Sequence, residues 1–277
     1  MEPGTRQDGG GILPEGLGQA IRRSARDIGA LLRTVTDTTV HVPGSEWTVG
    51  EAAAHLAQAN ELMAGLAQGH ERPYGDGTPQ SLAVANERAL AAFGERRAQP
   101  LADMIVQQAD LFLDAVAEAV AEGTADRTVA TPLGPMGHSV LASYLLTHML
   151  GHGYDLARAL GRPHMIDRVR VGLCVPFLMT AMPRVANTAA TAGLTVRYAL
   201  RLRGGPAFGV TFTDGTVDVT PRPPDRPDCT ILTEPVTFLL MALGRRTPWR
   251  AIARGQVLAW GSRPWLALRF PTLFTAP

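Results

Sequence analysis

The sequence predicts two units of different fold class: an N-terminal four-helix bundle and a C-terminal α+β domain with an antiparallel sheet and helices. Up to about residue 165, apolar residues recur three or four positions apart, which is typical of helices. After Gly193 they alternate with polar residues, which is typical of strands. Three histidines of the helical part, His55, His148 and His152, indicate a metal site in the bundle.

The chain has 277 residues, which is enough for two cores of ordinary size. The segments expected are a disordered leader at 1–14, the bundle at 15–165, a connecting helical segment at 166–194 and the α+β domain at 195–277. The leader is polar, acid-containing and rich in glycine, so it does not resemble a secretory signal. We expect the bundle and the α+β domain to be separate packing units.

Four long helices make up the predicted bundle. Leu17, Ile21 and Ile28 recur at helical spacing in the first. Thr48 and Glu51 form a capping-box pattern at the start of the second. The helices are expected at about 15–34, 48–68 and 139–160, with a third helical region in two stretches at about 80–94 and 101–122.

The C-terminal domain is predicted from stretches of period two, with a hairpin turn at Asp214-Gly215. Three aromatic residues, Trp249, Trp260 and Trp265, are expected in its core, with the lining of an apolar pocket as the alternative. The expected strands are LTVRYALRLR, AFGVTFT, GTVDVTP, DCTILT and GQVLAWG. Helices are expected at about 234–244, 247–254 and 263–273.

Composition excludes several classes of function. A net charge of +1 gives no reason to expect nucleic acid as a partner, and the apolar stretches fall short of the ~20 residues of a membrane span. All 26 basic residues are arginine, which rules out lysine-based catalysis. Cys174 and Cys229 match no C-x-x-C pattern, which favours a cytoplasmic protein, with a disulfide or a nucleophilic role for either cysteine as the alternative. The protein is expected to be either a monomer or a homodimer.

His148 and His152 form an H-x-x-x-H pattern, which places both imidazoles on one helix face. H-E-x-x-H zinc helices share this spacing, but the glutamate is missing here, which argues against a metalloprotease. His55 lies two turns into the second helix and is either the third ligand or a hydrogen-bonded core residue. Three ligands leave positions open for a substrate. The histidines expected at the surface are His41, His70, His138 and His164.

Two further side chains are candidates for a role beside the metal. Asp155, three residues after His152, either orients that imidazole or forms a salt bridge with Arg158. Arg245 or Arg246 could reach across the domain interface and bind a carboxylate through two hydrogen bonds.

Three motifs carry a family resemblance. SEWTVGEAAAHLAQ, in which His55 follows Trp47 by eight residues, resembles the second helix of the DinB-like superfamily. HMLGHGYDLARALGRP resembles the fourth helix of mycothiol-dependent maleylpyruvate isomerase-like proteins. LGRRTPWRAIARGQVLAWGSRPWLALRF resembles the end of the sterol-carrier-protein-like domain that those proteins often carry. The resemblance extends over both domains, from about 15 to 275.

The resemblance implies a divalent metal, usually zinc with iron or nickel as alternatives, on His55, His148 and His152, and mycothiol as the thiol cosubstrate. In the isomerases the middle ligand is glutamate, whereas here it is His148. An all-histidine triad is more similar to the thiol S-transferases of the superfamily. The resemblance therefore favours an S-transferase that adds mycothiol to a small electrophile, for example in natural-product biosynthesis.

Three alternatives stay open beside the S-transferase. One is a mycothiol-dependent cis-trans isomerase of the maleylpyruvate type, which begins with the same attack of a thiolate on carbon. Another is a non-catalytic module that binds an apolar ligand in the C-terminal domain. The last is a relic whose histidines bind no metal.

Overall fold

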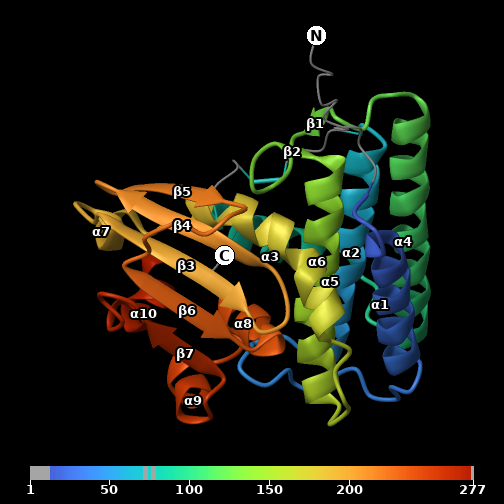
Figure 1. Ribbon diagram of the computed structural model, residues 1–277. Helices are drawn as coiled ribbons and strands as arrows, with labels where there is room; N and C mark the ends of the chain where they lie inside the picture. The colour runs from blue at the N-terminus through green and yellow to red at the C-terminus, as the bar shows by residue number, and fades with distance from the viewer. Residues whose placement is uncertain (1–12, 71–73, 76–78, 276–277) are drawn as a thin grey trace.

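The computed structural model describes residues 13–70, 74–75 and 79–275, so nearly all of the leader expected at 1–14 lies outside the described residues. Four long helices stand side by side as a bundle, and a shorter one, α3, contacts α2 (Figure 1). The helices of this part are α1 (Leu17–Leu32), α2 (Val49–Ala67), α3 (Pro79–Ala92), α4 (Ala98–Ala121) and α5 (His138–Ala159).

The helix starts and faces follow from the local sequence. Leu17, Ile21 and Ile28 of α1 are fully buried, as their spacing predicts. The capping box of α2 is present: the Thr48 hydroxyl accepts a hydrogen bond from the Glu51 amide, and the Glu51 carboxylate accepts one from the Thr48 amide. A short ribbon of β1 (Thr128–Val129) and β2 (Met136–Gly137) precedes α5.

The connecting helical segment expected at 166–194 consists of three helical pieces. They are α6 (Arg168–Ala181), the 3₁₀ helix η1 (Met182–Val185) and α7 (Thr188–Thr191). Pro176 is accommodated within α6, whereas the chain changes to 3₁₀ geometry around Pro183. α6 packs along α5, and its buried Arg170 is bound to Asp27 of α1 at 2.7 Å.

The C-terminal part contains a five-stranded sheet of order β5-β4-β3-β6-β7. All its pairs are antiparallel except the central β3–β6 pair, which is parallel because the chain returns from the edge strand β5 to the other side of β3. The strands are β3 (Val196–Leu202), β4 (Ala207–Thr213), β5 (Thr216–Thr220), β6 (Cys229–Thr233) and β7 (Val257–Trp260). The α+β class is confirmed, and the sheet is mixed.

One face of the sheet forms the core, where Tyr198, Phe208 and Phe212 are fully buried. The helices of this part are α8 (Pro235–Ala242), α9 (Pro248–Ala253), α10 (Leu266–Arg269) and the 3₁₀ helix η2 (Phe270–Leu273). The expected last helix at 263–273 is thus two short pieces. No helix in the described part of the chain is long and apolar enough to cross a membrane.

The prediction that the three C-terminal tryptophans form a core was wrong. Trp249 is 66% exposed, Trp265 63% and Trp260 47%. The core face is filled by phenylalanine, tyrosine and aliphatic side chains from the strands, and Trp260 belongs to the opposite face, in register with Thr230. Alternation within β7 therefore turns its tryptophan outward.

Candidate metal centre

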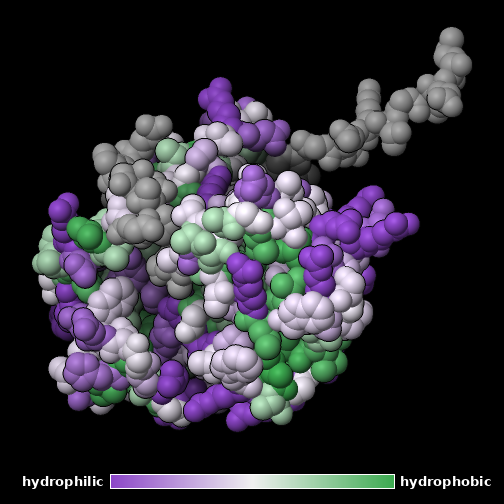
Figure 2. All heavy atoms as spheres, turned by 90° about the vertical axis from the view of Figure 1, so that its left-hand side faces the viewer, coloured by the Kyte–Doolittle hydropathy of each residue, from purple (hydrophilic) through white to green (hydrophobic). Residues whose placement is uncertain are grey.

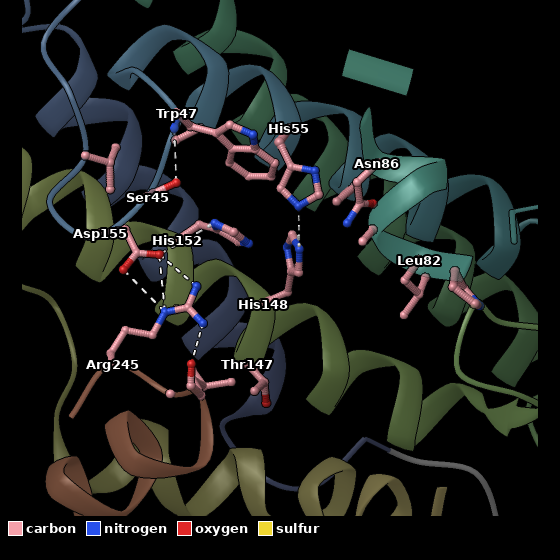
Figure 3. Close-up of a pocket in the computed structure, with 18 of the residues that line it drawn as sticks. Ser45, Trp47, His55, Leu82, Asn86, Thr147, His148, His152, Asp155 and Arg245 are labelled. Carbon is pink, nitrogen blue, oxygen red and sulfur yellow. Dashed lines mark hydrogen bonds and ion pairs between the residues drawn. The ribbon is translucent and has the colours of Figure 1, made fainter. Parts of the chain in front are cut away.

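His55 of α2 and His148 and His152 of α5 point toward one another from facing helices (Figure 3). One nitrogen from each ring can be chosen so that all three lie within 4.8 Å of one another. The Nε2 atoms of His55 and His148 are 3.2 Å apart. In a tetrahedral site with metal–nitrogen bonds of about 2.0–2.1 Å, ligand nitrogens lie roughly 3.3 Å apart, so this pair has the separation that a metal ion requires.

The three imidazoles are held in the neutral form that binds metals. Burial lowers the pKa of His55 to about 4, with a further contribution from the charge of Arg245. Burial also lowers the pKa values of His148 and His152 well below 6.5, again with help from neighbouring charges. The buried Nδ1 of His148 has no hydrogen-bond partner among the described residues. Three neutral, converging imidazoles with an unsatisfied polar atom fit a divalent metal ion.

Aromatic rings enclose this cluster on two sides. The Trp47 ring lies 4.9 Å from that of His55 and 6.2 Å from that of His152, measured between centroids. Tyr144, one turn before His148 on the same face of α5, stacks on Phe177 of α6 at 4.2 Å. The sequence analysis did not single out Tyr144, although its place four residues before His148 is a signal that it shares the face of the histidines.

Arg245 reaches from the end of α8 to the bundle and binds Asp155 of α5. Its Nη2 donates to the Asp155 carboxylate at 2.8 Å and its Nη1 donates to the Leu243 carbonyl at 2.5 Å. Arg245 reaches the bundle and binds a carboxylate, but this carboxylate belongs to Asp155 of the chain itself (Figure 3). The alternative pairing of Asp155 with Arg158 was wrong, because Arg158 instead donates to the Pro43 carbonyl.

Asp155 also lies beside the histidine cluster. One of its carboxylate oxygens is 3.8 Å from Nδ1 of His152. This separation is too long for a hydrogen bond, and an imidazole held in the neutral form makes no ion pair. Asp155 thus places negative charge between Arg245 and the ring of His152.

The other candidate residues lie away from the cluster. Arg246 donates to the Thr237 hydroxyl within the C-terminal part. Cys174 and Cys229 are buried free thiols, and burial raises the pKa of Cys174 to about 12, which makes it a poor nucleophile. His41, His70 and His164 are exposed, as expected.

The prediction that His138 is a surface residue was wrong. It is buried as the first residue of α5, where its two ring nitrogens face the carbonyl oxygens of Ala125 and Ala67 at 3.1 and 3.3 Å. The surrounding glycines and prolines indicated a loop, but the ring fixes that loop to the end of α2. His138 therefore has a carbonyl oxygen beside each ring nitrogen, of which a neutral ring donates to one, and it lies outside the histidine cluster.

A cavity of about 570 Å³ opens onto the three histidines. The bundle supplies most of its wall, including Trp47 and Tyr144, and the C-terminal part closes it with Leu243, Gly244 and Arg245. Its polar side chains include Tyr74, whose hydroxyl donates to the Asn86 side chain at 2.6 Å. A volume of this size holds a small organic molecule.

A histidine-lined helical bundle joined to an α+β domain with a mixed sheet defines a two-module protein with a cavity beside its histidine cluster. Residues 17–157 match the model of the mycothiol maleylpyruvate isomerase N-terminal domain, and residues 180–264 match that of the SCP-2 sterol transfer family. The chain belongs to the mycothiol maleylpyruvate isomerase N-terminal domain family, which confirms the resemblance seen in the sequence. No curated protein matches the chain.

Solved structures are similar to most of this chain. The crystal structure of a histidine-to-alanine mutant of the mycothiol-dependent maleylpyruvate isomerase is similar with a TM-score of 0.53 and 15% identity, over 89% of this chain and 93% of that chain. A second structure of the mycothiol-dependent maleylpyruvate isomerase has a TM-score of 0.48 at the same identity and coverage. At this level of identity the likeness to the first structure shows a common fold.

Proposed function

We propose that this protein is a metal- and mycothiol-dependent enzyme whose reaction begins when the thiol sulfur attacks an electrophilic carbon, and that its outcome is cis-trans isomerisation. The observation that carries the proposal is the convergence of three neutral imidazoles, one buried and two half-buried, in a cavity large enough for a small substrate. Family membership supports mycothiol as the thiol, and the names of the similar solved structures favour an isomerase over the S-transferase expected from the sequence.

His55, His148 and His152 would hold the metal, with zinc as the first candidate and iron and nickel as alternatives. On three uncharged ligands such an ion would keep its full charge and would supply Lewis-acid chemistry, which would lower the pKa of a thiol held at this site. The low pKa values of the histidines keep their lone pairs available at that pH. Trp47 shields the cluster from water on one side.

Arg245 is the group best placed to bind an acidic substrate. Its guanidinium lines the cavity and is already oriented by Asp155 and the Leu243 carbonyl. A planar guanidinium binds a carboxylate through two parallel hydrogen bonds, which fixes both the position and the angle of the substrate. We therefore assign Arg245 to substrate binding and Asp155 to the positioning of Arg245.

Tyr144 can stabilise the charge that develops when sulfur adds to a conjugated double bond. The S–C bond forms while the C=C bond becomes single, and the electron pair moves to the carbonyl oxygen of the substrate. Burial raises the pKa of Tyr144, so its hydroxyl stays protonated as a donor. Within the described residues this hydroxyl donates to no other group, which leaves it available to the substrate oxygen in the cavity.

The two candidate reactions differ in the fate of this adduct. In an isomerase, rotation about the new single bond is followed by cleavage of the S–C bond, which restores the C=C bond and the thiol. In a transferase, a carbon takes up a proton and sulfur stays bound. His148 in place of the glutamate that the resemblance implies is the one observation that favours the transferase.

The test is incubation of the purified protein with mycothiol and maleylpyruvate, with the products separated by chromatography and weighed by mass spectrometry. We expect a product of unchanged mass, formed only when thiol is present, and an adduct of summed mass would indicate the transferase instead. The His152→Ala protein should lose the activity, whereas the matched His41→Ala protein, altered at an exposed histidine, should keep it. If the protein neither binds thiol nor accelerates any conversion over His152→Ala, the enzyme proposal fails and the apolar-ligand module takes its place.

A further inference from the structure

The segment from Pro235 onward is rich in arginine and contains no acidic residue of its own, although Arg245 is paired with Asp155 of the bundle. From Pro235 to the last residue the sequence contains six arginines and not one aspartate or glutamate, although the whole chain has a net charge of only +1. The same stretch contains three of the four tryptophans. Overall charge therefore conceals a strong asymmetry between this segment and the rest of the protein, which points to an anionic partner.

These basic and aromatic residues belong to the elements at and beside the free edge of the sheet. α9, β7 and α10 follow one another along the chain, and β7 pairs with β6 alone (Figure 1). Between Trp249 and Leu268 the exposed tryptophans, arginines and large aliphatic residues form what we name the tryptophan–arginine surface. Its members are Trp249, Arg250, Ile252, Arg254, Leu258, Trp260, Arg263, Trp265 and Leu268. The side of the molecule on which the sheet lies shows hydrophobic and hydrophilic residues next to one another (Figure 2).

The exposure of these side chains has no explanation within the chain. Tryptophan is usually buried for most of its surface, yet Trp249 and Trp265 are about two-thirds exposed. Arg250, Arg254 and Arg263 are exposed and form no ion pair with any residue of the described part. Exposed apolar area beside unpaired cations is typical of an interaction surface.

The chemistry of the surface distinguishes between possible occupants. A symmetric contact with a second copy would bring two sets of arginines together, and like charges oppose such an interface. Nucleic acid would use the arginines but would leave aliphatic side chains such as Leu258 and Leu268 in water. An anionic bilayer uses both, because indole rings reside at the level of the lipid headgroups, aliphatic side chains enter the acyl boundary and arginines bind lipid phosphates.

We propose that the tryptophan–arginine surface docks this protein onto the face of an anionic lipid bilayer. The contact is peripheral, since the described residues contain no helix that could span a bilayer. The surface begins only four residues after Arg245, which lines the cavity, so a docked molecule holds that wall of its cavity close to the membrane.

The experiment is flotation of the full chain with vesicles of phosphatidylcholine alone or mixed equally with phosphatidylglycerol, with tryptophan emission as a second readout. We expect binding to the mixed vesicles with a blue shift of emission, weakened by salt, and little binding to phosphatidylcholine. The Arg250→Gln, Arg254→Gln, Arg263→Gln protein should bind about 100-fold more weakly, at about fivefold per arginine. A Trp249→Ser, Trp265→Ser protein should bind more weakly and lose most of the blue shift, with Trp260 as the remaining reporter on the surface. The matched control, Arg23→Gln with Arg26→Gln on α1, changes exposed arginines and should bind like the unaltered protein.

Circular dichroism of each variant would confirm that it is folded. The proposal is overturned if the unaltered protein fails to float with the anionic vesicles, or if the α1 control weakens binding as much as the surface variants do. It is also overturned if sedimentation shows a dimer that the Trp249→Ser, Trp265→Ser protein cannot form, since a second copy would then occupy the surface. Tighter binding to a single-stranded oligonucleotide, unaffected by the tryptophan substitutions, would likewise assign the surface to nucleic acid.

Discussion

The contact between Asp155 and Arg245 joins the two modules at the edge of the cavity, and removing either partner should reveal what it does. At 2.8 Å and an effective dielectric constant of about 20, the Coulomb attraction of the pair is ~6 kcal/mol before desolvation. The side chains are 17% and 27% exposed, which places the pair between surface pairs worth ~0.2–1 kcal/mol and buried pairs whose disruption costs ~3–5 kcal/mol. We expect a coupling of about 1–2 kcal/mol in the free energy of unfolding.

The effect on activity should depend on the charge of the substrate. Arg245→Gln removes two charge-assisted hydrogen bonds to a substrate carboxylate, so kcat/KM for maleylpyruvate should fall about 10–100-fold. The loss should be much smaller for an esterified substrate. Asp155→Asn leaves the guanidinium charged but poorly oriented and should cause an intermediate loss. Arg246→Gln is the matched control, because the neighbouring arginine binds Thr237 away from the cavity.

The assay combines urea unfolding of the two single variants and the double variant with kinetics on the acid and its ester. A double-mutant cycle isolates the pairwise contribution, because each substitution removes the same contact. Additive losses of unfolding free energy would show that the ion pair contributes nothing. An equal loss of kcat/KM on the acid and the ester would show that Arg245 does not bind the carboxylate, even if the coupling were present.

Three further predictions address the metal, the tyrosine and the capping box. Exchanging His55, His148 or His152 for alanine should remove most of about one divalent metal per chain measured by elemental analysis, and full occupancy in the triple variant would refute the assignment. Tyr144→Phe should lower kcat about 10–100-fold while mycothiol binding stays unchanged, and an unaltered kcat would exclude the hydroxyl from the reaction. Glu51→Gln should cost about 1 kcal/mol near neutral pH. Hydrogen bonding by Thr48 holds the pKa of Glu51 below 4.5, so this difference should shrink as pH falls through the lowered pKa, and a difference that persists in acid would contradict it.

The bundle could be predicted from the sequence because its determinants are local. Apolar spacing in α1 and the capping box of α2 depend on residues within a few turns of one another, so the same pattern that predicts each helix also describes its buried face. The histidine cluster could be predicted for a related reason. His148 and His152 lie one turn apart on a single helix, and only the approach of His55 required a fact about packing.

The features that the sequence analysis missed depend on partners far along the chain. His138 looks like a loop residue until α2 places the Ala67 carbonyl beside its ring. The pairing of Asp155 with Arg245 joins residues 90 positions apart, whereas the expected pairing with Arg158 was the nearest local choice. The parallel β3–β6 pair has the same cause, because alternation specifies which face of a strand is buried but not which neighbour it takes.

The close approach of the two modules suggests why the cavity needs both. Gly151 lies on α5 between the two histidine ligand candidates, and a Cβ there would come within 3.1 Å of the Leu243 side chain. A larger residue would push the end of α8 away from the bundle and carry Arg245 with it. We propose that 15–165 and 195–277 are separate packing units, joined by 166–194, whose contact at Gly151 is nonetheless part of the site. The bundle alone would keep the three histidines and Tyr144, but it would lack the guanidinium that distinguishes an acidic substrate from a neutral one.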